Sequence, residues 1–290
     1  MSGESAFIDS IRALAHHRAA RNLFDDAAVL EIGAETLVLT HDMMVEGVHF
    51  LPSQPREDVA WKLVASNLSD LAAKGAQPLG VLLGYMLGDD DEDFSAGLFD
   101  VLEHYSVPLL GGDTVSGGPP QAFGLTAIGL ATHSPVPSRG GARPGDALWV
   151  TGELGAAMLG FEALRDGTGG DTSSYSRPMA RLPEGLALAP LVTAMMDISD
   201  GLLLDAWRLA EASHASLAID SAAVPIAAPE ARRIDALRWG DDYELLFTWP
   251  AGTEPPVPAT RIGTVEPRGF APLFLDGEPI TNRDGLGYEH

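Results

Sequence analysis

The sequence contains no cysteine among its 290 residues, which excludes disulfide bonds, thiolate zinc sites and cysteine nucleophiles. Basic residues are scarce, because 18 Lys and Arg stand against 41 Asp and Glu and give a formal net charge of -23. Phosphate backbones and anionic lipid surfaces repel such a polyanion, so we expect neither nucleic acid nor a membrane as a partner. If the ligand is a phosphate compound, metal cations must lie between it and the carboxylates.

Long hydrophobic runs are also missing. The most apolar segments, 81–87 and 186–196, are too short to span a bilayer. Residues 1–21 carry His16, His17 and several Arg, and they lack the apolar core of an export signal. We therefore expect a soluble, cytoplasmic protein.

What is present is the composition of a globular protein, with 46% hydrophobic and 20% charged residues. At roughly 100–200 residues per domain, the length favours two domains. Residues 134–145 are rich in Pro, Gly and Arg and favour an interdomain connection. We predict an α/β protein with an N-terminal domain at 1–134 and a C-terminal domain at 135–290.

Hydrophobic periodicity predicts strands and helices in both halves. The expected strands are 29–30, 36–40, 80–87, 107–110, 122–132, 147–150, 217–220, 243–249 and 260–265. The expected helices are 7–20, 57–74, 94–104, 155–165, 183–193 and 201–213. We expect the strand at 107–110 to end in Gly111-Gly112, which leaves Asp113 in a turn.

Aspartates beside apolar segments are the most informative pattern. They are Asp25, Asp26, Asp42, Asp70, Asp113, Asp197 and Asp200. An isolated aspartate usually caps a helix or a turn, but this many together favour a metal site. Oxygen ligands without cysteine suit a hard cation such as Mg²⁺, which bridges carboxylates to phosphate oxygens.

Two pairs of aspartates deserve separate interpretations. Asp197 and Asp200 lie three residues apart at the mouth of a predicted helix, where a simple N-cap is the alternative to a metal site. Adjacent side chains in extended backbone point to opposite faces, so we expect only one of Asp25 and Asp26 to face the site. Local rules leave open which one does.

The usual nucleotide and hydrolase signatures are absent. The only lysines, Lys62 and Lys74, do not stand in a P-loop pattern. Residues 152–155 form only half of a dinucleotide fingerprint and favour helix packing. His41 and His49 lack the His-Glu-x-x-His pattern of zinc enzymes, and no Gly-x-Ser-x-Gly elbow supports a serine hydrolase.

Six segments together resemble the thiamine-monophosphate kinases of the aminoimidazole ribonucleotide synthetase superfamily. They are Asp25 to Ala28, Asp42 to Phe50, Asn67 to Ala76, Gly111 to Thr114, Asp197 to Gly201 and Asp241 to Leu245. The resemblance runs from about residue 23 to the C-terminal Gly287 to His290. Its most specific segments are Val-Glu-Gly-Val-His-Phe and Asp-Tyr-Glu-Leu. The segment Gly-Gly-Asp-Thr, in contrast, occurs across the superfamily.

The resemblance implies a two-domain, mixed α/β fold that dimerises through its N-terminal sheet, with ATP and several Mg²⁺ ions in a cleft. The implied metal ligands are Asp26, Thr40, His41, Asp42, Asp70, Asp113, Asp197 and Asp200. The implied ATP contacts are Gly112, Asp113, Arg139 and Ser199, and the implied contacts with thiamine monophosphate are His49, Asp241 and Tyr288. Four residues depart from the family pattern, and these departures leave the set of metal ligands intact but bear on the acceptor side: Phe24, His41, Trp239 and Asp241.

The implied reaction agrees with simple phosphate chemistry. A phosphate monoester carries about −1.5 to −2 charges at neutral pH, so it needs charge neutralisation rather than a general base. Positioning and electrostatics supply most of the catalysis in phosphoryl transfer. We therefore expect direct in-line transfer from ATP to thiamine monophosphate, without a catalytic side chain that forms a covalent intermediate.

Alternatives remain open at this point. A related superfamily enzyme could act on another acceptor, although selenophosphate synthetases use a Cys and a Lys near the N-terminus and hydrogenase-maturation relatives end in Cys, where this sequence ends in His290. A non-catalytic acidic module for metal or nucleotide binding is the second alternative. The negative charge is also compatible with adaptation to high salt, and residues 171–176 are a candidate lid.

Overall fold

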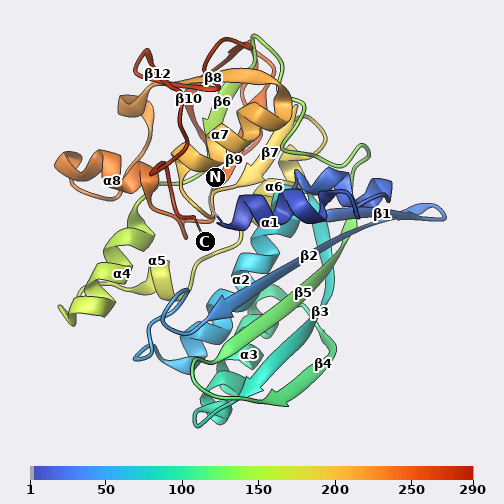
Figure 1. Ribbon diagram of the computed structural model, residues 1–290, viewed down its shortest axis with the longest axis vertical. Coiled ribbons are helices and arrows are strands. Elements are labelled where there is room, and N and C mark those ends of the chain that lie inside the picture. The colour runs from blue at the N-terminus through green and yellow to red at the C-terminus, as the bar shows by residue number, and fades with distance from the viewer. Residues whose placement is uncertain (1–2, 290) are drawn as a thin grey trace.

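The computed structural model describes residues 3–289, which form two β-sheets with helices around them (Figure 1). The predicted domains include Met1, Ser2 and His290, and the family resemblance includes His290. These three residues lie outside the described residues. The first sheet ends at Ala131 and the second begins at Ala147, so the predicted boundary falls in the segment between them.

The first half of the chain forms a mixed, five-stranded sheet in the order β1-β2-β5-β3-β4. Its strands are β1 (Ala28–Ile32), β2 (Glu35–Val45), β3 (Ala76–Leu87), β4 (Leu109–Ser116) and β5 (Ala122–Ala131). Only the β3–β4 pair in this sheet is parallel. Helices α2 (Arg56–Ala73) and α3 (Asp91–Tyr105) lie against one face, and α1 (Gly3–Arg12) and the 3₁₀ helix η1 (Arg18–Leu23) precede the sheet (Figure 1).

The second half forms a seven-stranded sheet in the order β12-β11-β8-β10-β6-β9-β7. Its strands are β6 (Ala147–Val150), β7 (Ala194–Asp197), β8 (Ala215–Ile219), β9 (Leu245–Trp249), β10 (Thr260–Pro267), β11 (Leu273–Leu275) and β12 (Glu278–Ile280). Its helices are α4 (Ala156–Asp166), α5 (Ser173–Ser176), α6 (Leu182–Leu188), α7 (Leu202–Ser213) and α8 (Arg233–Arg238), with 3₁₀ helices η2 (Ser221–Ala223) and η3 (Glu230–Arg232). The predicted mixed α/β class with two sheet-forming halves is confirmed.

Helix α2 is buried on every side because it lies between the two halves. It packs against the first sheet and also against α6 and β7 of the second half. One hydrophobic core therefore runs through both halves and joins Leu68 of α2 to Met195 of β7 and Phe247 of β9. The polar residues of α2 lie inside this core and must find protein partners, since an unpaired buried polar group is costly.

Several predicted elements end elsewhere than expected; the strand predicted at 36–40, for example, continues as β2 to Val45 and includes Asp42. The strand predicted at 107–110 continues as β4 through Gly112 and Asp113, because the backbone there pairs with β3. The helix predicted at 183–193 stops at Leu188, and residues 194–197 pair with β9 as strand β7. The helix predicted at 7–20 stops at Arg12, and a separate 3₁₀ helix follows, with the His17 side chain accepting from Ala19 N–H at its start.

Among the described residues, no helix combines the length and the apolar character that crossing a membrane requires.

Candidate metal and phosphate site

A cleft of about 600 Å³ opens between the two halves of the chain. Ten of the predicted site residues line it: Asp26, Asp42, His49, Asp70, Arg139, Asp197, Ser199, Asp200, Asp241 and Tyr288. They come from distant parts of the sequence, so the fold brings together most of the residues that the family resemblance implied. Carboxylates gather at one end of the cleft, which we call the acidic end. Aromatic side chains gather at the other end, which we call the aromatic end.

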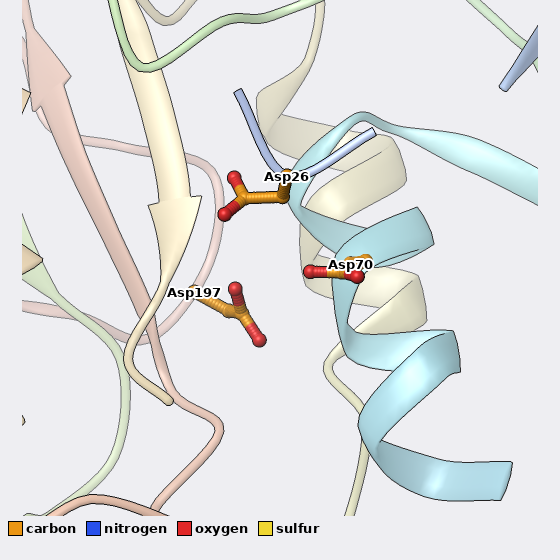
Figure 2. Close-up of side chains that lie close together, drawn as sticks. All are labelled: Asp26, Asp70 and Asp197. Carbon is orange, nitrogen blue, oxygen red and sulfur yellow. The ribbon is translucent and has the colours of Figure 1, made fainter. Parts of the chain in front are cut away.

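Three carboxylates converge at the acidic end of the cleft (Figure 2). Oxygen atoms of Asp26, Asp70 and Asp197 all lie within 4.8 Å of one another. Asp26 precedes β1, Asp70 lies in the last part of α2, and Asp197 ends β7. Oxygen donors alone, at this spacing, form a donor set suited to a hard divalent cation.

Burial and mutual repulsion disfavour ionisation of three carboxylates of the cleft, those of Asp42, Asp70 and Asp197. Burial, together with the charges of neighbouring aspartates, raises the pKa of Asp197 to about 7 and the pKa of Asp42 to about 6. The same causes hold the pKa of Asp70 well above its usual range. A bound cation would favour the ionised forms, so the arrangement is electrostatically suited to a metal.

Asp26 differs from its neighbours because two basic groups contact it. Burial disfavours its anion, but the charges of Arg139 and Lys74 outweigh burial and lower the pKa of Asp26. Lys74 Nζ lies 3.0 Å from Asp26 Oδ2, and it also binds Asp25. Asp25 is held by Lys74 and Arg21, whereas Asp26 lines the cleft. The expectation that only one of this pair faces the site is confirmed.

Polar side chains of α2 hold the surrounding strands in place. Asn67 Oδ1 accepts a hydrogen bond from the backbone N–H of Asp42 at 3.1 Å. The Ser69 hydroxyl donates to Asp197 Oδ2 at 2.6 Å. One helix therefore fixes β2 from the first sheet and β7 from the second around the same cleft.

Four predicted ligands do not line the cleft of the single chain. Thr40 is buried behind it and donates to Asp70. His41 is exposed, with its Nδ1 2.9 Å from the Thr126 hydroxyl. Gly112 and Asp113 lie on β4, where every residue is exposed.

The register of the first sheet shows how far β4 lies from the cleft. Asp42 is paired with Leu125, Leu125 with Leu83, and Leu83 with Gly112. Three strand spacings of about 4.8 Å separate Asp42 from Gly112 by roughly 14 Å. Within one chain, Asp113 therefore cannot share a metal ion with the aspartates of the cleft.

The aromatic end of the cleft contains a buried lysine that sequence reasoning missed. Lys62 Nζ lies 2.9 Å from Asp241 Oδ2 and 3.8 Å from the centre of the Tyr175 ring. It also donates to the backbone oxygen of His49 at 3.3 Å. The Tyr243 hydroxyl donates to Asp241 Oδ1 at 3.0 Å. Asp241 is thus fixed from two sides.

The scarcity of lysine was the signal that could have identified these residues. Lys62 and Lys74 are the only lysines in the sequence, and both are almost completely buried. Buried ammonium groups require carboxylate partners, and in an acidic protein those partners are functional candidates. Arg208, which pairs with both Asp200 and Asp205, was also missed.

Family models match both halves of the chain. The N-terminal domain of AIR synthase related proteins matches residues 24–131, and the C-terminal domain of the same proteins matches residues 143–270. Thiamine-monophosphate kinase of Escherichia coli strain K12 is 38% identical over 297 residues, covering 92% of this chain and 90% of the relative. Thiamine-monophosphate kinase of Aquifex aeolicus is 31% identical over 314 residues, covering 99% and 98%.

Solved structures show the same similarity. The structure described as AaThiL complexed with AMPPCP and TMP has a TM-score of 0.86 at 31% identity, covering 97% of this chain and 95% of that chain. Thiamine-monophosphate kinase from Stenotrophomonas maltophilia has a TM-score of 0.78 at 33% identity, covering 95% and 96%. The hydrogenase maturation protein HypE in complex with ATP has a TM-score of 0.71 at 20% identity, covering 99% and 97%, and shares the fold alone.

The raised pKa values predict a pH-dependent response to magnesium. A carboxyl whose folded pKa exceeds its unfolded value of about 3.9 loses its favourable contribution as pH rises through the folded pKa. The metal-free protein therefore loses stability from about pH 4, where an aspartate ionises in the unfolded chain, up to about pH 7, where Asp42 and Asp197 ionise in the folded protein. Mg²⁺ binds the ionised forms, so we expect MgCl₂ to raise Tm more at about pH 8 than at about pH 5, as measured by thermal unfolding.

Two matched variants control this measurement. Asp70→Asn should abolish most of the rise in Tm with MgCl₂, because it removes one of the three converging carboxylates. Asp93→Asn removes the same charge from an exposed position on α3 and should leave the rise unchanged. An equal rise at both pH values, or in all three proteins, would show that magnesium does not bind these carboxylates.

Proposed function

The chain belongs to the AIR synthase related proteins and, within them, to the thiamine-monophosphate kinases, and from this premise we propose that it transfers a phosphoryl group from ATP to thiamine monophosphate. The products are ADP and thiamine diphosphate. One observation carries the proposal: a single cleft joins the carboxylates Asp26, Asp70 and Asp197 to His49 and Asp241. ATP as donor makes the cytoplasm the proposed location of the reaction.

The two ends of the cleft suit the two parts of the acceptor. Lys62, at the aromatic end, and Asp70, at the acidic end, are eight residues apart on α2, or about 12 Å along the helix axis. We assign the phosphate groups to the acidic end. The thiamine rings belong to the end with His49 and Asp241, which the family resemblance also implies.

The donor set fits Mg²⁺ at the acidic end. The ligands that we propose from one chain are Asp26, Asp42, Asp70, Asp197 and Asp200, with Thr40 orienting Asp70. These carboxylates repel one another when ionised, and the raised pKa values of Asp42, Asp70 and Asp197 reflect that repulsion and their burial. Magnesium ions, when bound, would neutralise the phosphate charges and orient the phosphate oxygens.

Arg139 is the proposed protein contact for the phosphates of ATP, together with Ser199. Its guanidinium lines the cleft and pairs with Asp26. Its Nε is buried and has no hydrogen-bond partner among the described residues. A phosphate oxygen would satisfy this donor, because guanidinium groups bind phosphate through several N–H groups at once.

The acceptor needs no general base. Its phosphate already carries about −1.5 to −2 charges at neutral pH, so its oxygen is a nucleophile without proton removal. The chain contributes position and charge: α2 fixes the carboxylates, Arg139 binds the donor, and Asp241 binds the ring end of the acceptor. Direct in-line transfer follows as the proposed mechanism.

A second copy of the chain is the proposed partner, bound through the uncovered face of the first sheet. Figure 1 shows α2 and α3 on the opposite face. Met43, Leu82, Leu110 and Val115 are 56%, 39%, 54% and 50% exposed on β2, β3 and β4. Clustered exposed apolar side chains mark interaction surfaces. In a dimer, β4 of one copy would bring Gly112 and Asp113 to the cleft of the other.

Parallel assays of ADP release test the function. With ATP and MgCl₂, we expect turnover with thiamine monophosphate and not with thiamine or an aminoimidazole ribonucleotide-type acceptor, and we expect mass spectrometry to identify thiamine diphosphate. Asp70→Asn should lower kcat/KM by about 10²–10³-fold because it removes charge stabilisation, and Asp93→Asn should not. Turnover with the aminoimidazole compound would identify another superfamily enzyme, and ATP binding without turnover would identify a non-catalytic module.

Stereochemistry at the transferred phosphorus tests the direct mechanism. With ATP made chiral at the γ-phosphorus by oxygen isotopes, a single in-line displacement inverts the configuration. We expect inversion in the thiamine diphosphate product. Retention would require two displacements and a covalent enzyme intermediate.

Mixed dimers test whether Asp113 acts across the interface. Asp70→Asn and Asp113→Asn should each be inactive alone. If Asp113 serves the partner's cleft, a mixed dimer has one cleft with both residues intact, so an equal mixture should recover about one quarter of wild-type activity with random pairing. A mixture of Asp70→Asn with Asp26→Asn should recover none, since both residues lie in the same cleft. Activity no higher than the mean of the two variants would refute the arrangement.

A further inference from the structure

Three aromatic side chains line one wall of the cleft at its aromatic end. They are Phe161 of α4, Tyr175 of α5 and Trp239, which follows α8, and we call them the aromatic wall. The Phe161 ring centre lies 5.2 Å from that of Tyr175, at 67° between the planes, and 5.2 Å from that of Trp239, at 39°. The wall is thus one continuous, ordered surface rather than three separate residues.

The loop that carries Trp239 is held firmly against the metal-site loop. The backbone N–H of Asp241 donates to the carbonyl of Ser199 at 2.9 Å. Gly240 packs so closely there that an added Cβ would lie 2.3 Å from the Ser199 oxygen. Trp239 and Asp241 therefore occupy fixed positions on either side of Gly240, and rigid placement lowers the entropic cost of binding a ligand.

Two cationic side chains of the protein already contact the wall, and one of them is Arg165, whose guanidinium carbon lies 5.5 Å from the centre of the Phe161 ring. Lys62 Nζ sits 3.8 Å from the centre of the Tyr175 ring, which is a cation–π distance. Tyr175 is 3% exposed, whereas Phe161 and Trp239 are only partly buried and line the cleft. Phe161 and Trp239 are therefore the members of the wall that present ring surface to the cleft, and Arg165 already lies over the Phe161 ring.

The proposed acceptor has the chemistry that such a surface recognises. Thiamine monophosphate carries a thiazolium ring with a permanent positive charge and a flat aminopyrimidine ring. A cation over the face of a Trp or Phe ring is attracted by the negative potential of that face, and most strongly by Trp. Flat rings also gain contact area from stacking.

We propose that Trp239 and Phe161 bind the charged ring system of the acceptor and determine its selection. The inference rests on the proposed function and extends it to residues that the family resemblance did not assign a role. Asp241, fixed by Lys62 and Tyr243, lies beside the wall and accepts hydrogen bonds from the acceptor. The wall selects for positive charge, and Asp241 selects for donor groups.

Leucine substitutions test the wall because they keep apolar volume and remove the ring. Trp239→Leu and Phe161→Leu should each raise the KM for thiamine monophosphate by about 5- to 30-fold, the range expected for a desolvated cation–π contact. The KM for ATP and kcat should change little. Trp239→Phe should retain most of the affinity. Trp207→Leu is the matched control, because Trp207 packs partly buried against the core of the second half and does not line the cleft.

An uncharged acceptor of the same shape shows how much of the binding depends on the positive charge of the thiazolium ring. The thiophene analogue of thiamine monophosphate keeps both rings and the phosphate but carries no positive charge on the five-membered ring. The wild-type protein should prefer the charged compound, and Trp239→Leu should reduce that preference by the same 5- to 30-fold range. Equal losses for both compounds, or a change confined to the KM for ATP, would overturn the inference.

Calorimetry with thiamine keeps the inference separate from the proposed function. Thiamine has the same charged rings and no phosphate, so its binding without ATP reports on the wall and Asp241 without any contribution from the phosphate contacts. Weaker thiamine binding by Trp239→Leu than by Trp207→Leu supports the wall even if the wild-type protein forms no thiamine diphosphate, in which case the proposed function fails by itself. Equal thiamine binding by Trp239→Leu and the wild-type protein overturns the wall whatever the outcome of the ADP assay.

Discussion

The burial of α2 between the two halves is the constraint on which the site depends. A helix buried on all sides must satisfy its polar side chains with protein partners, and here those partners are the groups around the cleft. Asn67 binds the Asp42 backbone, Ser69 binds Asp197, and Lys62 binds Asp241. The same contacts that hold the two halves together therefore set the geometry of the site.

The acidic end of the cleft brings together negative charges that repel one another in the folded protein. Folding brings carboxylate oxygens of Asp26, Asp70 and Asp197 within 4.8 Å of one another, and within residues 3–289 only Asp26 of these three has basic side chains as partners. Such crowding lowers stability unless a cation joins the carboxylates. The site thus trades stability of the free protein for binding of metal and phosphate, which is common where function requires clustered charge.

The sequence predicts local elements and candidate ligands better than their relations in space. The strong period of α2 and the aspartates beside apolar segments were visible without a structure. The extension of β4 through Asp113 was not, because Gly111-Gly112 favours a turn locally and only pairing with β3 keeps the backbone extended. The Lys62–Asp241 pair and the aromatic wall also depend on residues far apart in the chain, and no local pattern predicts such contacts.

The two lysines have a consequence for the outer surface of the molecule. Lys62 and Lys74 are 2% and 1% exposed, and the chain has no other lysine. Every exposed basic side chain is therefore an arginine or a histidine. Acylation of amines, whether by a chemical label or by an acetyl-transferring enzyme, finds no lysine on the folded surface, and reaction at a lysine would report that the two halves have separated around α2.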